Sequence, residues 1–527
     1  MARNLTYDVA IVGYGPVGAV FANLLSVYGL RVAVFEQAAA VYDKPRAITI
    51  DHEVLRVFQA CGLAAFMEGH IAPHPGTHYL GIEGEVIKIF DPMPPPYPLG
   101  WVPTATFVQP DTEKALRDRL AQYASADVFL SARMTSFAQD AEGVTLSVAS
   151  DSAPPTIRAT YLVACDGANS LARKQLGIAL DDLAFDEQWM VVDAWTNDQA
   201  KRPNKCFQYC RPSRPGTYLP GPGALRRWEI KLLAGEGPQD FADDGSILKV
   251  LGEFTDTNDL TLWRSAVYRF HALLAREWRR DRVLLMGDAA HQMPPFLGQG
   301  FAAGVRDAVN LAWKLAMVLR GQASSDLLDT YEVERKPHVG TIVQTAKDFG
   351  TIIGELDVAA AQARDCRLRK ELQAGTAETV RQKFIPNLEA GVIARATPLA
   401  GELLVQPFVR LRDGGSGRLD DLLKRGFVIA ATELAPLEQL SEKSERLWRH
   451  LDGDKAVIAR KPVAASGAVK SFVETDDLFA GWLTARGVIA VVVRPDRYAF
   501  GAARNVDELN TLIAELGTML GVAPAEK

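Results

Sequence analysis

Three glycine-rich turns carry the residue types in this chain that could do chemistry. The first is Gly-Tyr-Gly-Pro-Val-Gly at residues 13–18, and Glu36 ends the apolar segment that follows it. Gly13 permits a sharp turn, Gly15 lets the backbone approach a pyrophosphate, and Gly18 lets the next helix pack closely on a sheet. The Glu36 carboxylate can accept hydrogen bonds from a ribose. The pattern predicts a dinucleotide site, although similar turns open many α/β units that bind nothing.

Two further turns pair glycine with aspartate. Asp166-Gly167 and Gly287-Asp288 each follow a short apolar run, at the position where open α/β sheets bind ligands. Their carboxylates can hold the hydroxyls of a ribose or a ribityl chain, and either alone could be only a helix cap. Residues 294–300, Pro-Pro-Phe-Leu-Gly-Gln-Gly, lead into a helix whose free amides can receive a reduced, anionic flavin ring, or they could simply cap a core helix. In this order the turns favour an FAD enzyme over a plain NAD dehydrogenase.

Apolar runs and glycine punctuation place these turns on regular elements. Residues 7–36 have the pattern of a strand, a tight turn, a helix and a second strand, which is a βαβ unit. Residues 305–319 have apolar side chains at helical spacing and predict a core-facing helix that stops at Gly321. Further strands are expected at 144–148, 161–165 and 282–286, and a further helix at 109–123.

The remaining sequence predicts two more units. Residues 73–103 are rich in Pro, Gly and aromatic residues and mark an excursion from the nucleotide-binding unit. Alternating, aromatic-rich segments between 183 and 269 predict a mostly antiparallel sheet, the expected wall of a substrate site. Charged helical sequence continues to about residue 390, and Pro398 and Gly401 mark a junction. Beyond it we expect a small α/β unit with strands at 426–431, 456–460 and 488–493 and a helix at 506–520.

The composition limits the function classes. The chain has 527 residues, 48% of them hydrophobic, which is enough for two or three domains. A net charge of −6 provides no basic field for nucleic acid or anionic lipid, so a small-molecule substrate is expected. Five cysteines without a metal-type double pair predict no metal site, no disulfide framework and a reducing compartment. Residues 9–30 carry no charge but are broken by glycines and a proline, so we expect a cytoplasmic protein without a membrane span.

The three turns and their surroundings resemble the single-component, FAD-dependent aromatic hydroxylases, the family of para-hydroxybenzoate and phenol hydroxylases. The resemblance extends over residues 5–395 and includes the run Arg-Asp-Ala-Val-Asn-Leu-Ala-Trp-Lys-Leu at 306–315. Within that family the chain looks closest to 3-(3-hydroxyphenyl)propionate hydroxylase-like proteins. The segments that carry this finer resemblance are Pro-Arg-Ala-Ile at 45–48, Gln-Pro at 109–110, Arg-Arg-Trp-Glu at 226–229 and Arg-Pro-Asp-Arg-Tyr at 494–498.

The resemblance implies an α/β chain of three units. These are a Rossmann-like FAD-binding domain, an inserted, mostly antiparallel β-sheet substrate domain, and a C-terminal degenerate thioredoxin-like α/β domain. The tail has no Cys-x-x-Cys pair, so packing or oligomerisation, for example in a homodimer, is expected of it instead of redox exchange. The expected boundaries are 1–75, 104–182 and 281–395 for the FAD-binding domain, 76–103 and 183–280 for the substrate domain, and 396–527 for the C-terminal domain.

The resemblance also implies a reaction. NADH or NADPH would bind transiently and reduce FAD, and dioxygen would then form a flavin hydroperoxide that transfers one oxygen atom ortho or para to the hydroxyl of a phenol or phenylpropanoid-type substrate. Arg46 and Arg173 could meet the nicotinamide phosphates or could be ion pairs and loop anchors. A flavin oxidase or reductase without oxygen insertion is an alternative, and a non-catalytic FAD-fold escort protein is another. A flavin halogenase and a disulfide reductase are not supported, because the Trp-x-Trp-x-Ile-Pro segment and the redox cysteine pair are missing.

Flavin contacts are carried over from the same resemblance. Pro295 is expected beside the ring, with a role in catalysis as well as in binding. Family members commonly carry Asn at the position of Ala302, so only the backbone of Phe301 and Ala302 is expected at the pyrimidine edge. The full set of expected cofactor-binding residues is Gly13, Gly15, Pro16, Val17, Gly18, Glu36, Gln37, Arg46, Gln109, Asp166, Gly167, Gly287, Asp288, Pro295, Gly298, Gln299, Gly300, Phe301 and Ala302.

The catalytic base and the substrate contacts are less well defined by the sequence. Phenol hydroxylase-like members place an Asp or His near the position of Ile48, which cannot take a proton. Asp51 and His52 are the candidate bases, against the interpretation that they are a helix cap and a packed histidine. Candidates to line the substrate pocket, some of which could be ordinary sheet positions, are Gln208, Tyr209, Tyr218 and Arg211, the last as a carboxylate ligand.

Overall fold

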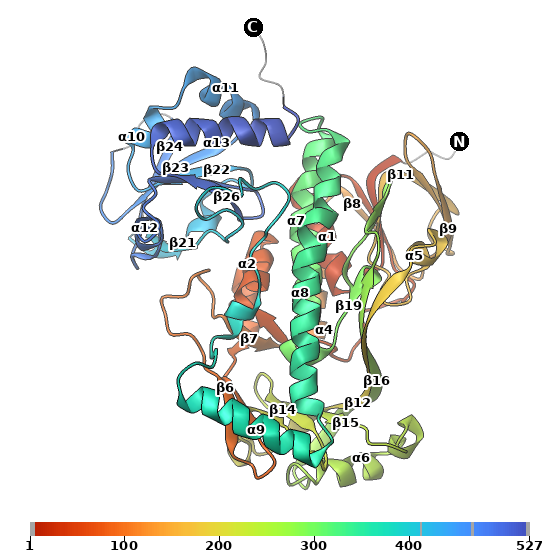
Figure 1. Ribbon diagram of the computed structural model, residues 1–527. Helices are drawn as coiled ribbons and strands as arrows, with labels where there is room; N and C mark the ends of the chain where they lie inside the picture. The colour runs from red at the N-terminus through yellow and green to blue at the C-terminus, as the bar shows by residue number, and fades with distance from the viewer. Residues whose placement is uncertain (1–5, 412–413, 465–467, 523–527) are drawn as a thin grey trace.

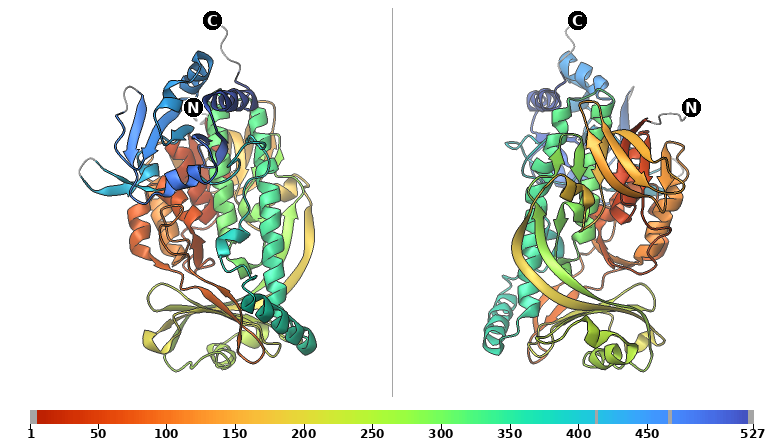
Figure 2. Two further views of the ribbon diagram at one scale, coloured as in Figure 1. Left: turned by 60° about the vertical axis from the view of Figure 1, so that its left-hand side comes forward. Right: turned by 90° about the vertical axis from the view of Figure 1, so that its right-hand side faces the viewer.

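The computed structural model describes residues 6–411, 414–464 and 468–522. Two long helices, α7 (Gly300–Leu319) and α8 (Asp329–Gly354), lie side by side in the middle of the molecule (Figure 1). The C-terminal unit lies towards one end of α8, and the large antiparallel sheet lies at the other end. Figure 2 shows the same arrangement from two further sides. None of the helices in the described ranges is both long and apolar enough to cross a membrane.

The first sheet positions the three turns. Its central strands are parallel, with β1 between β2 and β11, and β18 on the far side of β11. The strand expected at 161–165 begins earlier, at Thr156, because its first residues pair with β10. The order is β17 (Arg279–Arg280), β18 (Val283–Leu285), β11 (Thr156–Ala164), β1 (Thr6–Val12), β2 (Val32–Phe35) and β8 (Ala126–Phe129), with β10 (Val144–Ala149) and β9 (Arg133–Gln139) attached to β11.

Helices α1 (Pro16–Val27), α4 (Gln109–Leu120) and α7 cover this sheet, which confirms all three expected helices. The approach of α1 to α7 is close at Gly304, where a Cβ atom would lie 2.5 Å from a Val17 methyl group. Helix α7 begins at Gly300, five residues before the apolar spacing that predicts it. Its first turn is built from glycine, alanine and one phenylalanine, so hydrophobic periodicity does not reveal it.

The second sheet is mostly antiparallel, as expected, and its only parallel pair in the described chain joins β13 to β5. Strands β12 and β16 are long and carry the sheet towards the first one. The excursion at 73–103 supplies two of its strands. The order is β19 (His291–Gln292), β16 (Leu260–Ala275), β12 (Leu180–Thr196), β15 (Leu225–Lys231), β14 (Gly216–Pro220), β13 (Cys206–Tyr209), β5 (Thr77–Leu80) and β6 (Val86–Phe90).

The helical sequence after α8 ends sooner than expected. Helix α9 (Val358–Gln373) stops where Gly375 adopts a φ of 68°, a left-handed conformation that terminates helices. The chain from there to residue 395 has one short helical turn, at Arg381–Phe384, and is otherwise irregular. From α9 this segment runs past β7 and α2 before it reaches the C-terminal unit (Figure 1).

The C-terminal unit is a five-stranded α/β sheet with thioredoxin-like strand order. Parallel β22 and β23 are followed by the antiparallel pair β25–β26 and by helix α13, and β24 adds an outer edge. All four elements expected in the tail are present. The order is β24 (Val469–Val473), β23 (Asp454–Ala459), β22 (Val428–Ala431), β25 (Ala490–Val493) and β26 (Ala499–Ala503), with α10 (Ala435–Glu438), α11 (Glu442–His450), α12 (Leu478–Thr484) and α13 (Val506–Met519) around it.

Buried charges fasten the C-terminal unit to α7 and α8. Arg494 lies 2.7 Å from Glu334 and 2.6 Å from Asp496, and Lys314 lies 2.8 Å from Glu334. All four side chains are fully buried. Smaller elements complete the fold: a sheet of β3 (Thr49–Asp51), β7 (Thr104–Phe107) and β4 (Ile71–Pro73), the hairpin β20 (Phe408–Arg410)–β21 (Ser416–Arg418), and helices α2 (His52–Ala60), α3 (Ala64–His70), α5 (Leu171–Gln175) and α6 (Asp244–Leu251).

Candidate functional site

The three turns meet around one cavity. Strands β18, β11 and β1 are parallel neighbours, so the turns that follow them lie at the same edge of the sheet. The cavity has a volume of about 520 Å³, which is in the range of small-molecule sites, and it continues to the inner face of the second sheet. The expected cofactor residues that line it are Gly15, Pro16, Val17, Gly18, Arg46, Gln109, Gly167, Gly287, Asp288, Pro295, Gly298, Gly300 and Phe301.

In the first turn, two glycines allow close packing and one faces the cavity. A Cβ atom on Gly13 would lie 2.2 Å from the carbonyl oxygen of Cys165, and one on Gly18 would lie 2.1 Å from the carbonyl oxygen of Gly13. A Cβ atom on Gly15 would meet nothing within 4 Å. Helix α1 starts at Pro16 without a side-chain cap, so its first free amides are available to an anion such as a pyrophosphate.

Glu36 lies beside the first turn but does not line the cavity. Its carboxylate accepts hydrogen bonds from the backbone amides of Tyr14 and Ala38, each at 2.8 Å. These bonds fix the turn on the second strand. Gln37 is exposed next to it. A contact of Glu36 or Gln37 with the ribose therefore stays a prediction.

The second turn is held by Asp166 and Arg173. One oxygen of Asp166 accepts the first two amides of α5, at 2.8 and 3.2 Å, so this residue is the helix cap that the alternative interpretation describes. Its other oxygen, Oδ1, is buried without a partner in the described chain and can accept a hydroxyl. Arg173 donates to the carbonyl oxygens of Ala168 and Ala289, each at 2.8 Å. Arg173 therefore ties the second turn to the third and is a loop anchor instead of a phosphate ligand.

Asp288 directs a free carboxylate into the cavity. The side chain is exposed there, and in the described part of the chain no donor reaches its oxygens. Although this carboxyl opens into the cavity, the protein around it removes much of its solvation and raises its pKa, against the lowering effect of His291 and Arg46. A hydroxyl-bearing ligand would supply the missing donors. Together with the open backbone at Gly15 and the orphaned oxygen of Asp166, Asp288 fits the sugar alcohol and pyrophosphate of FAD.

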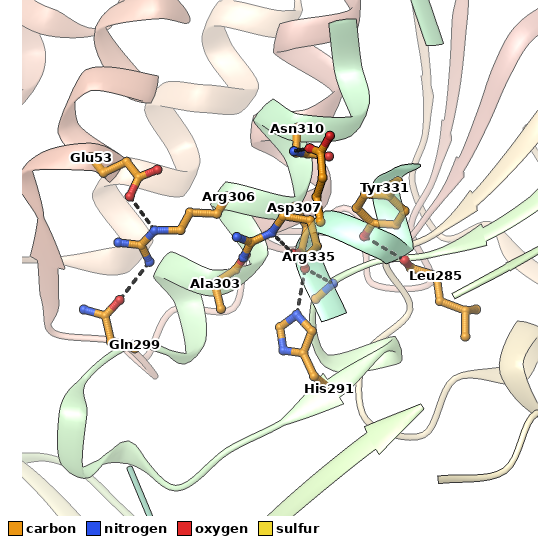
Figure 3. Close-up of polar contacts among 12 residues, drawn as sticks. Glu53, Leu285, His291, Gln299, Ala303, Arg306, Asp307, Asn310, Tyr331 and Arg335 are labelled. Atoms are coloured by element: carbon orange, nitrogen blue, oxygen red, sulfur yellow. Dashed lines mark hydrogen bonds and ion pairs between the residues drawn. The ribbon is translucent and has the colours of Figure 1, made fainter. Parts of the chain in front are cut away.

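Consecutive residues of α7 support the third turn and residues 294–300 from behind (Figure 3). We call residues 294–300 the ring segment, because the flavin ring is expected there. Asp307 accepts from the Gly287 amide at 3.2 Å and pairs with His291 at 2.7 Å. Arg306 donates to the Gln299 side chain at 2.8 Å, which holds that amide away from the cavity. Burial opposes ionisation of Asp307, but His291 and Arg335 keep its pKa below the usual value. The predicted residue Ala302 is 1% exposed and packs under the segment without lining the cavity.

The Arg306 side chain also connects the ring segment to the C-terminal unit. It forms ion pairs with Asp51 and Glu53, and the other oxygen of Glu53 accepts the hydroxyl of Tyr498 at 2.8 Å. Burial raises the pKa of Tyr498 well above its usual value, so the hydroxyl stays a donor. A continuous set of polar contacts thus runs from the C-terminal unit to Gln299.

Arg46 and Gln109 lie together at the edge of the cavity. The Gln109 side chain accepts the backbone amides of Arg46, at 3.0 Å, and Ala47, at 2.6 Å. Arg227 donates to the carbonyl oxygen of Arg46 at 2.7 Å and is paired with Asp193 at the same distance. The loop is therefore fixed from both sides, while the Arg46 guanidinium is exposed and free to meet a phosphate.

Two rows of inward-facing side chains on the second sheet form the far wall of the cavity. One row crosses five strands in register, and all its members line the cavity: Val191, Glu229, Thr217, Gln208 and Tyr79. The parallel row two residues away along each strand contributes Arg264, Arg227, Leu219, Cys206 and Thr77. Because side chains alternate across a strand, the residues between these rows point to the other face.

Of the four predicted substrate residues, Gln208 lines the cavity and the other three do not. Gln208 lines the cavity and accepts the Thr217 hydroxyl at 2.6 Å. Tyr209 and Tyr218 point to the opposite face, where Tyr218 donates to the carbonyl oxygen of Pro203 at 3.0 Å. Arg211 follows the end of β13 and donates to backbone carbonyl oxygens at the surface, so it does not reach the cavity.

Asp51 and His52 lie outside the large cavity. Asp51 caps helix α2 through the Val54 amide at 3.0 Å and is paired with Arg306. Burial would raise its pKa, but Arg306 holds it below the usual value, which makes Asp51 a poor proton acceptor. Burial lowers the pKa of His52, and both residues line a separate cavity of about 140 Å³. The helix-cap and packed-histidine interpretation describes them.

The titratable residues that line the large cavity without having been predicted include Glu229, His74 and Arg381. Glu229 lies inside a recognised motif, and burial raises its pKa. Burial lowers the pKa of His74 to about 3, so this imidazole is neutral. Arg381 comes from the irregular segment after α9. Strand alternation could have identified Glu229 once one inward residue was known, but no sequence signal identifies Arg381.

The fold and the site define a flavin-dependent enzyme, and comparison with known proteins agrees. Residues 6–346 match the FAD binding domain family, and residues 401–518 match the HcaD C-terminal domain. A 3-(3-hydroxy-phenyl)propionate/3-hydroxycinnamic acid hydroxylase of Comamonas testosteroni is 32% identical, over 97% of each chain. A protein of that name from Burkholderia cenocepacia strain HI2424 is 35% identical, over 94% of this chain and 93% of the relative.

Solved structures show the same fold. The flavin-dependent monooxygenase PieE, in complex with FAD and substrate, superposes with a TM-score of 0.80 at 21% identity, over 99% of this chain and 100% of that one. OxyS anhydrotetracycline hydroxylase from Streptomyces rimosus gives a TM-score of 0.78 at 23% identity, with the same coverage. The chain belongs to the FAD binding domain family. It is a single-component, FAD-dependent aromatic hydroxylase.

Proposed function

We propose that this enzyme hydroxylates the ring of a phenol or phenylpropanoid-type substrate, ortho or para to the phenolic hydroxyl, with NADH or NADPH and dioxygen as co-substrates. The observation that carries the proposal is the continuity of the cavity, which runs from the Gly15 turn past residues 295–301 to the two rows on the second sheet. The relatives named for 3-(3-hydroxyphenyl)propionate and 3-hydroxycinnamic acid support this substrate class.

The protein's first task is to hold the redox cofactor. When bound, FAD would supply the redox chemistry, which is acceptance of hydride from the nicotinamide and activation of dioxygen for transfer of one oxygen atom. The turns at 13–18, 166–167 and 287–288 would hold its pyrophosphate and sugar portions. Pro295, Phe301 and the start of α7 would position its ring next to the substrate wall, which is the face of the second sheet that lines the cavity.

The second task is to orient the phenol and accept its proton. Glu229 is the carboxyl group in the substrate rows that faces the cavity, and the nearest cation, Arg227 Nη1, lies 4.0 Å away. Burial raises its pKa, which brings the carboxylate closer in basicity to a phenolate and makes proton transfer less unfavourable. We assign Glu229 as the proton acceptor, in place of Asp51 or His52.

The third task is to exclude water, because bulk solvent in the site would divert activated oxygen into hydrogen peroxide. An aromatic cluster lies behind the ring segment. Phe296 packs edge-on against Trp189 and Phe185, with ring centroids 4.9 and 5.9 Å apart. These rings give residues 295–297 a rigid, apolar support.

We propose that residues 1–75, 104–182 and 281–395 form the FAD-binding domain. Residues 76–103 and 183–280 form the substrate domain, and residues 396–527 form the C-terminal domain. The five cysteines are unpaired, which supports a reducing, cytoplasmic environment. The proposal includes a homodimer, which sedimentation of the purified protein would detect. An FAD oxidase or reductase without oxygen insertion is the competing function.

A panel of phenols and phenylpropanoids tests the proposal. Purified enzyme reconstituted with FAD should oxidise NADH or NADPH faster when the right aromatic is added, and mass analysis should find a product heavier by one oxygen. A matched non-phenolic compound, such as 3-phenylpropionate beside 3-(3-hydroxyphenyl)propionate, should leave no hydroxylated product. If no aromatic stimulates reductant oxidation, the oxidase or reductase function is favoured instead.

A further inference from the structure

Arg381 lies between two cavities and belongs to none of the sequence motifs described above. It lines both the large cavity and the 140 Å³ cavity behind it. Its Nη2 atom donates to the Leu297 carbonyl oxygen, next to the ring segment. The same atom would lie 2.6 Å from a Cβ atom on Gly298, so the guanidinium fills the space left by that glycine.

The Arg381 guanidinium lacks a carboxylate partner. Within the described ranges no Asp or Glu oxygen lies within the 4.0 Å limit of an ion pair, and Nε and Nη1 make no hydrogen bond. By contrast, the three other arginines of the substrate wall are paired: Arg227 and Arg264 with Asp193, and Arg269 with Asp186.

The neighbours of Arg381 that line the large cavity do not neutralise it. Its charge acts on Tyr79, Cys206 and His74, which are side chains of the substrate wall. Burial raises the pKa of Cys206 to about 12 and that of Tyr79 well above 10, and it lowers the pKa of His74 to about 3. All three are therefore neutral near pH 7. Within the described structure the carboxylate that acts on Arg381 is that of Asp51, which lies beyond ion-pair distance and is itself paired with Arg306.

An unpaired, desolvated cation costs free energy, which an anionic ligand with matching geometry recovers. We propose that Arg381 binds the carboxylate of the aromatic substrate and selects acidic phenols over neutral ones. This inference rests on the proposed function. It replaces Arg211 as the carboxylate ligand.

The spacing of the sheet agrees with this assignment. Glu229 lies on β15, and the neighbours of Arg381 lie on β13 and β5, two and three strands away. Strands are about 4.8 Å apart, so the two ends of the site are separated by roughly 10 to 14 Å at the level of the backbone. Side chains reaching in from both ends shorten this span to the length of a phenol with a two- or three-carbon acidic side chain.

The test compares Arg381→Met and Arg381→Lys with Arg211→Met, using FAD-loaded enzyme. Arg211 does not line the cavity and donates to backbone carbonyl oxygens at the surface. Each variant is assayed with 3-(3-hydroxyphenyl)propionate, its neutral amide and 3-propylphenol. Substrate dissociation constants are measured from the flavin absorbance change in the absence of reductant, and FAD affinity and Tm are measured alongside.

Loss of one charged hydrogen-bonded contact should raise the dissociation constant and KM for the acid on the order of 10- to 100-fold in Arg381→Met. The two neutral phenols should bind as they do to the parent, Arg381→Lys should recover part of the loss, and Arg211→Met should change little. Equal loss on acid, amide and propylphenol would overturn the inference, because Arg381 would then serve the phenolic oxygen or the flavin. An unchanged affinity for the acid would also overturn it.

These outcomes are distinct from failure of the proposed function. If no phenol is hydroxylated by the parent enzyme, the function itself is wrong. If the parent hydroxylates the acid and Arg381→Met does so with the same KM, the function stands and the assignment of Arg381 falls.

Discussion

Arg306 and Asp307 are consecutive residues of α7 that hold two different parts of the flavin site, the ring segment and the third turn. Arg306 donates to Gln299 at 2.8 Å (Figure 3), and Asp307 accepts the Gly287 amide at 3.2 Å. One turn of helix thereby fixes both the ring segment and the turn that carries Asp288. Since both side chains are almost completely buried, the flavin site is rigid before a cofactor binds.

The first prediction separates binding from folding in the first glycine turn. Gly15→Val should keep the fold, because a side chain there enters open space, and should abolish FAD retention by filling the pyrophosphate position. Gly13→Ala should instead destabilise the protein, because its Cβ would lie 2.2 Å from the Cys165 carbonyl oxygen. Flavin content and the Tm of the apoprotein measure the two effects. A Gly15→Val protein that retains FAD would contradict the placement of the pyrophosphate.

The second prediction concerns Asp288. Asp288→Ala should raise the FAD dissociation constant by about 10- to 100-fold, because a charged acceptor for the cofactor hydroxyls is lost. The apoprotein should not lose stability, since no described donor depends on this carboxylate. Flavin fluorescence quenching measures the affinity. Glu142→Ala, an exposed carboxylate remote from the cavity, is the control, and equal FAD affinity in both variants would refute the role of Asp288.

The third prediction gives the C-terminal unit a part in the flavin site. Tyr498→Phe removes the hydroxyl that Glu53 accepts and should cost about 1 to 3 kcal/mol of stability. Because Glu53 also holds Arg306, and Arg306 holds Gln299, the visible circular dichroism of bound flavin should change as well.

The control for Tyr498 removes a similar contact at the same interface. Trp313→Phe deletes a 3.0 Å hydrogen bond to Asp496 that does not lead to Gln299. This variant should lower Tm without altering the flavin spectrum. Identical flavin spectra in Tyr498→Phe and the parent would show that the C-terminal unit only packs against the enzyme.

The fourth prediction is a pH dependence that originates at Glu229. Burial raises the pKa of this carboxyl, so it is protonated at low pH and becomes a proton acceptor only as pH rises through a value above its usual 4.5. Turnover of a phenol should rise through that pKa in the parent. Glu229→Gln should lose the step and about 100-fold or more of the rate. A variant with the parent's pH profile would exclude Glu229.

Local patterns in the sequence were sufficient for the framework of the site. Apolar runs punctuated by Gly13 and Gly29 predict β1, α1 and β2 because these signals act between near neighbours. The three turns could be grouped for the same reason, since parallel strands deliver their carboxyl ends to one edge. The apolar spacing predicts the start of α7 at residue 305 and not at Gly300, because the first turn of the helix is made mainly of small residues.

The far wall required information that local patterns do not contain. Alternation shows that Gln208 and Tyr209 face opposite sides, but not which side is the cavity. Asp51 has the appearance of a free carboxylate until Arg306, 255 positions away, is brought to it. Arg381 lies in an irregular segment, where neither periodicity nor turn chemistry assigns a direction to the side chain.

The most direct test of the whole account uses isotopically labelled dioxygen with the best phenolic substrate. A cavity that places a phenol against bound FAD predicts a hydroxylated product that carries one labelled oxygen atom per ring, formed in step with reductant consumption. Recovery of all the consumed dioxygen as hydrogen peroxide, with the phenol unchanged for every member of the panel, would contradict the account.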